Sequence, residues 1–196
     1  MSARVAPLAR ADLAELEPVF AAVFAGMGFV PNSMLTMARS PQLLRAFAGL
    51  AMTVLGPGTL SAELKQLVAH VASLAAGCRY CQAHTGGSAA RAGASHAKVG
   101  AAFEFETSAL FSAAERAALR LARDAAQAPS LASDAHFAEL REHFSEAQIT
   151  ELVSVIALFG FLNRWNDTMA TTLEPEPRAF ASEALSRAGW KIGAHG

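Results

Sequence analysis

The sequence predicts an all-α protein, and three observations lead to that prediction. Hydrophobic residues make up 53% of the 196 residues, and much of that share is alanine, which favours closely packed helices. No run of alternating valine or isoleucine marks a strand. Apolar residues instead recur at spacings of three and four, as in Ile149, Leu152, Ile156 and Phe159.

The first half of the chain predicts five helices, at about 12–25, 33–39, 41–55, 61–76 and 78–92. Turns rich in glycine and proline separate them, and Pro18 must lie near the start of the first helix. Ser61 suits the N-cap of the fourth helix, and Gly77 suits its C-terminal end. The fifth helix begins at or just before Cys78, although a Gly-Gly pair weakens its middle.

The second half predicts helices at about 112–127, at 134–143 and from Ser145 onward. Ser112 with Glu115, and Ser145 with Gln148, fit the capping box, in which two side chains satisfy each other's backbone donors. The EPEP segment at 174–177 is expected to stop the last long helix. A short helix and a loose end should follow it.

A faint repeat indicates how these helices are organised within one domain spanning residues 1–196. A shift of 85 residues lays 66–81 over 151–166, so that CRYC coincides with NRWN. The repeats would be about 41–105, which carries both thiols, and about 112–173, which carries none. We therefore expect two pseudo-symmetric helical hairpins. Chance alignment of two alanine-rich helices is the alternative.

Composition and charge exclude several classes of protein. The formal net charge is −1 and basic residues do not cluster, so nucleic acid is not an expected partner. No uninterrupted apolar run approaches the roughly 20 residues of a spanning helix, so no membrane partner is expected. Residues 1–25 carry charges throughout and do not resemble a secretory signal. A cytoplasmic location is the expectation.

The two cysteines, Cys78 and Cys81, are the strongest functional signal, in the segment GCRYCQAH at 77–84. A pair at this spacing can close a disulfide within one helical turn, which favours redox chemistry over two inert buried thiols. The start of a helix, Arg79 and His84 would all favour a thiolate here. Attack by one thiolate gives a sulfenic acid, which the other thiol converts to a disulfide.

Metal binding is the rival chemistry for this segment. Cys78, Cys81 and His84 offer three zinc ligands, whereas a structural zinc site usually has four. Other histidines, among them His70, do not lie at a recognisable ligand spacing. The residues therefore favour a redox dithiol with no metal and no organic cofactor.

The GCRYCQAH segment after one amphipathic helix, and FLNRWNDT at 161–168 on another, resemble the carboxymuconolactone decarboxylase-like superfamily. The branch they resemble is that of the AhpD-like alkylhydroperoxidases, over roughly residues 30–175. The resemblance implies an AhpD-like all-α fold, homo-oligomers and a small thiol peroxidase or disulfide reductase. It also implies that Cys81 attacks the peroxide, that Cys78 resolves the intermediate and that His84 belongs to a proton relay.

Two positions depart from the family pattern. Gln66 stands where the pattern has a glutamate, and an amide cannot serve as a general base. His84 follows Cys81 by three residues instead of four, which rotates its ring by about 100° around the helix. His70 lies one turn beyond Gln66 on the same face, so we hypothesise that it replaces the glutamate as base towards Cys81 or as a bridge to His84. A buried core histidine is the alternative reading of His70.

For other residues the sequence gives no specific chemical role. Tyr80 and Trp165 are expected to be core or oligomer contacts, although they could also shape a substrate cavity. Asn166 and Asp167 are read as part of a structural polar network, with a place in the pocket wall as the alternative. The remaining histidines, namely His96, His136, His143 and His195, are expected at the surface or at helix caps.

The function predicted from the sequence is a thiol-dependent peroxidase or disulfide reductase that uses Cys78 and Cys81. Its expected partners are a small peroxide substrate, an external dithiol reductant and further copies of the chain. Two alternatives stay open. One is a carboxymuconolactone-type decarboxylase, and the other is a non-catalytic oligomeric module that senses redox state.

Overall fold

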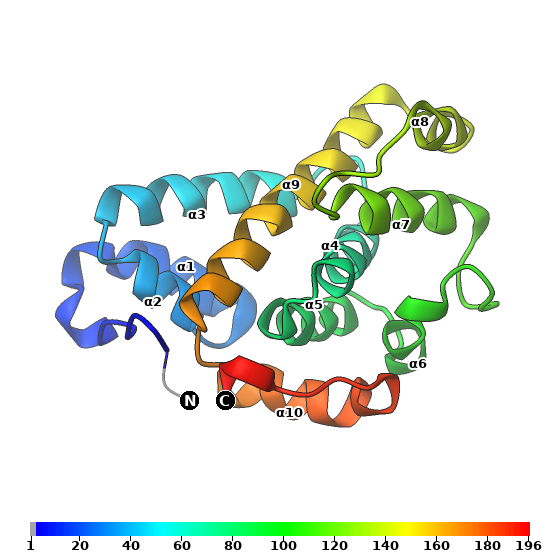
Figure 1. Cartoon of the computed structure of the whole chain (residues 1–196). Coiled ribbons are helices and arrows are strands. Elements are labelled where there is room, and N and C mark those ends of the chain that lie inside the picture. Colours follow the sequence, from blue (N-terminus) through cyan, green and yellow to red (C-terminus); the bar gives the residue numbers. More distant parts are fainter. Residues whose placement is uncertain (1–2) are drawn as a thin grey trace.

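The computed structural model describes residues 3–196, and this part of the chain is helical without any strand (Figure 1). The predicted all-α fold is confirmed. The α-helices are α1 Glu17–Met27, α2 Asn32–Met37, α3 Pro41–Leu55, α4 Ala62–Ala76, α5 Arg79–Arg91, α6 His96–Gly100, α7 Ala113–Ala125, α8 Asp134–Arg141, α9 Glu146–Met169 and α10 Pro175–Ala184.

The local signals at the helix ends act as the sequence indicates. The Ser61 hydroxyl accepts the backbone N–H of Leu64 at 3.2 Å and caps α4. Gly77 ends that helix at φ 78°, a left-handed conformation that glycine adopts without a steric cost. The capping boxes that begin at Ser112 and Ser145 are both formed, and they fix the starts of α7 and α9.

The two ends of the chain differ from the prediction. The first α-helix begins at Glu17, because residues 10–16 form two 3-10 turns before it. The EPEP segment starts a helix instead of stopping one: α9 already ends at Met169, and Pro175 occupies the first turn of α10, where its missing N–H costs nothing. The tail is not loose either, since Trp190 and His195 are buried.

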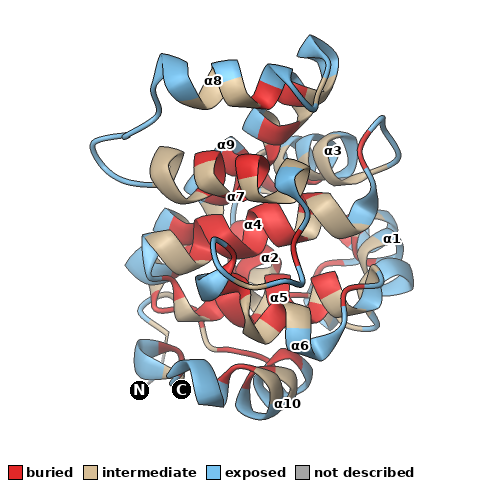
Figure 2. Cartoon of the chain, turned by 90° about the vertical axis from the view of Figure 1, so that its right-hand side faces the viewer, coloured by how far each residue is buried: buried red, intermediate tan, exposed pale blue. Residues whose placement is uncertain are grey.

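Helix α4 forms the centre of the fold and packs mainly against α5, α7 and α9. Figure 2 shows the buried residues concentrated there, while α8 and the outer face of α10 are exposed. By length and composition α9 could cross a membrane, yet it lies against α4, α5 and α7 as a core helix of a globular protein. Its C-terminal half carries two of the site residues described below, Asn166 and Asp167.

A second, smaller hydrophobic cluster joins the N-terminal segment to α2 and α3. Leu16, Phe20, Met37 and Leu44 are fully buried in it or nearly so. Figure 1 shows α1, α2 and α3 on one side of α9 and α7 on the other. The N-terminal helices therefore close over one side of the α4, α5 and α9 core, and a cavity lies between the two clusters.

Candidate active site

The two thiols lie at the start of α5, where the backbone turns from Gly77 into the helix. Cys78 is the N-cap residue, and its sulfur accepts the backbone N–H of Cys81 at 3.4 Å. Both cysteines are free and buried, with exposed fractions of 0% and 2%. The hydrogen bond between the two thiols, followed by burial, raises the pKa of Cys78 far above its usual value. Cys78 is therefore the protonated partner of the reduced pair.

An elongated cavity of about 650 Å³ lies beside Cys81, and Cys78 does not line it. Its volume falls within the ~300–1,000 Å³ typical of small-molecule sites. Most of its wall is apolar and comes from α1, α2, α3 and α9; these residues include Val19, Val23, Met27, Met34, Phe47, Leu55, Leu158, Phe159 and Leu162. The side chains of Met27 and Met34 thus contact the cavity. A substrate in this space would meet one sulfur only.

Asn166, on α9, also lines this cavity and contacts Cys81. Its side-chain amide lies 3.4 Å from the Cys81 sulfur and also donates to the carbonyl of Leu162 at 3.0 Å. An amide N–H pointing at a sulfur stabilises the thiolate over the thiol. Asn166 stands 85 residues after Cys81 and is its counterpart in the predicted repeat. The structure therefore gives Asn166 a place in the cavity wall, which was the alternative reading.

A histidine and a buried carboxylate complete this side of the site. His84 Nε2 donates to Glu174 at 2.7 Å, and the Tyr80 hydroxyl donates to the other carboxylate oxygen at 2.7 Å. The backbone N–H of Asn32 also donates to Glu174. Burial would raise the pKa of Glu174, but the hydrogen bond from His84 and the other donors outweigh it, and the pKa falls below its usual value. Glu174 is thus an ionised carboxylate held by three donors.

Tyr80 links this carboxylate to the imidazole by stacking on it. The two ring centroids lie 4.3 Å apart with 25° between the planes. Burial and the charge of Glu174 raise the pKa of Tyr80 well above its usual value, so the phenol stays a neutral donor. Since Nε2 of His84 is committed to Glu174, Nδ1 is the nitrogen left to exchange a proton. We call Cys81, His84, Glu174 and the cavity the cavity face of the dithiol.

Of the two residues considered for the proton relay on α4, Gln66 lines the cavity and His70 does not. Gln66 lines the cavity and so faces the same space as Cys81 and His84. His70 is fully buried on the other side of α5, where its Nδ1 lies 3.0 Å from the Thr85 hydroxyl. Burial lowers the pKa of His70 to about 4. Among the described residues, His70 makes no hydrogen bond with Cys81 or His84, so its proposed relay role stays a prediction.

The other side of the dithiol faces the C-terminal tail. His195, which we expected at the surface, is 3% exposed and lies beside Cys78. Its ring bonds the Thr171 carbonyl through Nδ1 at 2.9 Å and the Asp167 carboxylate through Nε2 at 3.2 Å. Burial would lower the pKa of His195, but the hydrogen bonds to Asp167 and Cys78 outweigh it and raise the pKa to about 9. We call Cys78, Asp167 and His195 the tail face.

The tail face is also where a metal would have to be considered. Ligand atoms of Cys78, Asp167 and His195 lie within 4.8 Å of one another, whereas His84 is outside this group. Both ring nitrogens of His195 face oxygen acceptors, however, so both carry protons and neither offers a lone pair to a metal. We therefore interpret the group as a charge pair around a thiol.

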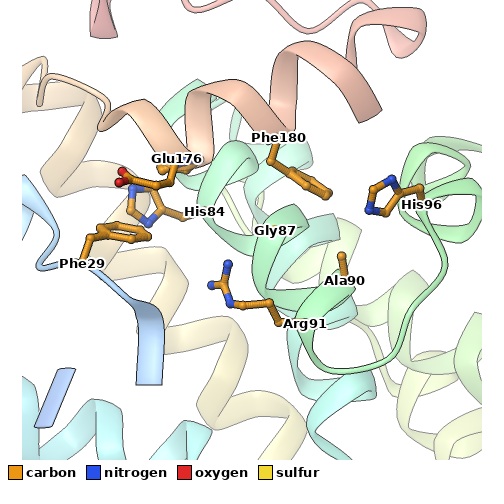
Figure 3. Close-up of a pocket in the computed structure, with 9 residues that line it drawn as sticks. Phe29, His84, Gly87, Ala90, Arg91, His96, Glu176 and Phe180 are labelled. Atoms are coloured by element: carbon orange, nitrogen blue, oxygen red, sulfur yellow. The ribbon is translucent and has the colours of Figure 1, made fainter. Parts of the chain in front are cut away.

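A second cavity of about 320 Å³ lies between α5, α6 and α10 (Figure 3). Figure 3 shows His84 with Phe29 and Glu176 at one end, and His96 beyond Phe180 at the other. His84 lines both this cavity and the larger one, so its ring stands between the two spaces. The close approach of α10 depends on Gly86, where a Cβ atom would lie 3.0 Å from the Phe180 ring.

Known proteins with this arrangement identify the family. The carboxymuconolactone decarboxylase family matches over residues 41–124. The solved structure of the debrominase Bmp8 in its apo form is 42% identical, with a TM-score of 0.86 over 92% of this chain and 97% of the debrominase. The chain belongs to the carboxymuconolactone decarboxylase family. A cysteine-to-alanine variant of the same debrominase, solved with 2,3,4-tribromopyrrole, is equally similar, with a TM-score of 0.87.

Within the family, the AhpD-like fold is confirmed as well. A peroxidase-related protein from Ralstonia eutropha JMP134, described as an alkylhydroperoxidase AhpD core, has a TM-score of 0.81 at 24% identity over 92% of this chain and 96% of its own. At that identity the likeness concerns the fold alone. Among curated proteins, no sequence matches this chain.

Proposed function

We propose that this protein is a dithiol-dependent reductase that removes halogen from a small halogenated aromatic compound. The observation that carries the proposal is the apolar cavity of about 650 Å³ that ends on the sulfur of Cys81. Such a space fits an aromatic ring with several heavy halogen atoms, and it is much larger than a small peroxide needs. The likeness to a debrominase over nearly the whole of both chains supports the same substrate class.

The reaction follows from the positions of the groups. The Cys81 thiolate attacks the halogen, the carbon–halogen bond breaks, and the ring carbon keeps the electron pair and takes a proton. His84 lies on the same cavity wall and supplies that proton, with Glu174 holding its ring. Cys78 then attacks the Cys81 sulfur, halide leaves, and a disulfide forms. Two electrons have passed from the dithiol to the substrate, and an external dithiol reduces the disulfide again.

Thiol-dependent reduction of organic hydroperoxides is the second candidate. It is favoured by the same Cys81 sulfur at the cavity wall, with His84 in position to protonate the leaving alkoxide. Here Cys81 attacks the terminal oxygen, the O–O bond breaks, and Cys78 converts the sulfenic acid to a disulfide with loss of water. Both candidates use the cysteines in the same order, so the substrate decides between them.

A substrate comparison tests the proposal directly. Reduced protein is incubated with dithiothreitol and either brominated pyrroles and phenols, including 2,3,4-tribromopyrrole, or cumene hydroperoxide. We expect bromide release that depends on Cys81, is lost in Cys81→Ala and exceeds hydroperoxide consumption. Turnover of the hydroperoxide alone would establish the second candidate, and turnover of neither would reject both.

Two further outcomes correspond to the alternatives predicted from the sequence. A single stoichiometric burst without turnover would identify a redox sensor. Conversion of a ring-cleavage lactone by the oxidised protein would identify a decarboxylase. We also propose that the protein works as a homo-oligomer in the cytoplasm, where small dithiol proteins can reset the disulfide. Light scattering at working concentration tests the oligomer.

A further inference from the structure

The imidazole of His195 is held in a place where only its charged form satisfies its neighbours. Nδ1 lies 2.9 Å from the Thr171 carbonyl oxygen, and Nε2 lies 3.2 Å from an Asp167 carboxylate oxygen. Both partners only accept hydrogen bonds, so each ring nitrogen must donate a proton. With an exposed fraction of 3%, this is a buried imidazolium paired with a carboxylate.

The Cys78 sulfur is the third member of this group. It lies within 4.8 Å of a ring nitrogen of His195 and of the Asp167 carboxylate, and it also accepts the Cys81 N–H at the start of α5. The imidazolium and the helix N-terminus stabilise negative charge on this sulfur, whereas the Asp167 carboxylate opposes it. Cys78 does not line the substrate cavity, so this charge cannot act on the substrate.

We propose that His195, positioned by Asp167, stabilises the Cys78 thiolate in the two steps where Cys78 makes or breaks the disulfide. The proposal rests on the dithiol chemistry of the proposed function, and it assigns the two cysteines to separate histidine–carboxylate pairs. In this scheme His84 and Glu174 manage protons at Cys81. His195 and Asp167 control the charge at Cys78.

The first step is closure of the disulfide. At rest Cys78 is a thiol that bonds to Cys81, and this bond is the largest influence holding its proton. Once Cys81 carries halogen or oxygen, that acceptor is lost. Cys78 then releases its proton through Asp167, whose side chain is 45% exposed, and attacks Cys81 beside the imidazolium. The sulfur–halogen or sulfur–oxygen bond breaks, and halide or water leaves.

The second step is reduction of the disulfide. An external thiolate reaches Cys81 from the cavity, since Cys78 is fully buried. The intramolecular disulfide breaks, and Cys78 leaves as a thiolate next to His195. A better-stabilised leaving thiolate makes this exchange faster. The second thiol of the reductant then frees Cys81.

Two other ionisable side chains lie near this group. The Tyr80 ring centroid is 5.8 Å from that of His195, with its phenol bonded to Glu174. The Arg4 guanidinium donates to the backbone carbonyl of Asp167 at 3.2 Å, at the end of α9.

The test measures ionisation of Cys78 alone. In a Cys81→Ala background the only thiol is Cys78, and the ultraviolet absorbance of its thiolate is titrated against pH. We expect His195→Gln to shift the midpoint upward by about 1 to 3 units, the range for loss of an adjacent opposite charge. Asp167→Asn should shift the midpoint less than His195→Gln in either direction, because losing a carboxylate that raises the pKa of Cys78 offsets the weaker hold on the imidazolium. The exposed His143→Gln is the matched control and should not shift the curve.

This experiment separates the inference from the proposed function, because the titration needs no substrate. Loss of turnover on every substrate would remove the function and leave the titration intact. An unchanged midpoint in His195→Gln would overturn the inference. Should circular dichroism show that this variant does not fold, His195→Asn takes its place, and its unchanged midpoint would be equally fatal.

Discussion

The two faces of the dithiol use the same kinds of residues for different purposes. On the cavity face, Cys81, His84 and Glu174 meet a space of about 650 Å³ that can hold a substrate. On the tail face, Cys78 and His195 are sealed and only Asp167 reaches solvent. The difference teaches that the two thiols are not interchangeable: one faces the substrate, and the other faces a fixed charge.

The largest expected effect comes from removing each sulfur in turn. Cys81→Ala should lose turnover by at least ~10³-fold, because the attacking atom is gone. Cys78→Ala should also stop turnover, but it should still consume one equivalent of substrate and leave the transferred halogen or oxygen on Cys81. Rapid-quench kinetics and mass spectrometry of the intact protein distinguish the two. A burst in Cys81→Ala would reverse the assignment.

A smaller loss is expected from Glu174→Gln. The amide cannot hold His84 as a charged pair, so we expect kcat to fall by about 10²-fold, the lower range for acid–base groups. Glu183→Gln is the control, since Glu183 is an exposed carboxylate of α10. Steady-state assays of both variants check this. Equal activity of the two would show that Glu174 is structural only.

The charged pair of the tail face should also affect the stability of the folded protein. The pKa of His195 is raised to about 9, so its pairing stabilises the folded state below about pH 6.5 and is lost as pH rises through 9. We expect His195→Gln to lower the free energy of unfolding by about 1 to 3 kcal/mol near neutral pH, and this difference from wild type should disappear above pH ~9. Urea unfolding at several pH values measures it. A difference that does not change with pH would contradict a charged pair between His195 and Asp167.

His70 should give the smallest effect on turnover. The pKa of His70 is about 4 in the folded state, so as pH falls the unfolded chain binds a proton at this residue before the folded chain does. The folded state therefore loses stability between about pH 6.5 and about pH 4. His70→Gln should remove this acid sensitivity while leaving kcat and the pH profile of thiol alkylation unchanged. A shifted alkylation profile would restore His70 to the proton relay.

Much of the fold and the dithiol could be predicted from the sequence, because local rules govern them. Periodicity and capping boxes located most helices, and a CxxC segment after Gly77 located the thiols at the start of α5. The predicted end of the last long helix and the predicted loose tail were wrong. Proline occurs both after the end of one helix and in the first turn of the next, so the EPEP segment did not show which of the two it marks.

Two residues of the site, Glu174 and His195, could not be predicted in this way. Glu174 and His195 lie 90 or more residues from the cysteines in the sequence, within a turn and a tail that have no periodic pattern. Only packing of α10 and the tail against α5 brings them to the dithiol.

The most direct test of the central claim compares the two sulfurs in the reduced wild-type protein. Brief treatment with iodoacetamide, followed by denaturation and labelling with a heavy form of the reagent, gives the modified fraction of each cysteine by mass spectrometry. If reagents reach the dithiol from the cavity, the light reagent should modify Cys81 at least about ten times faster than Cys78. Equal labelling, or faster labelling of Cys78, would contradict the division of the dithiol into two faces.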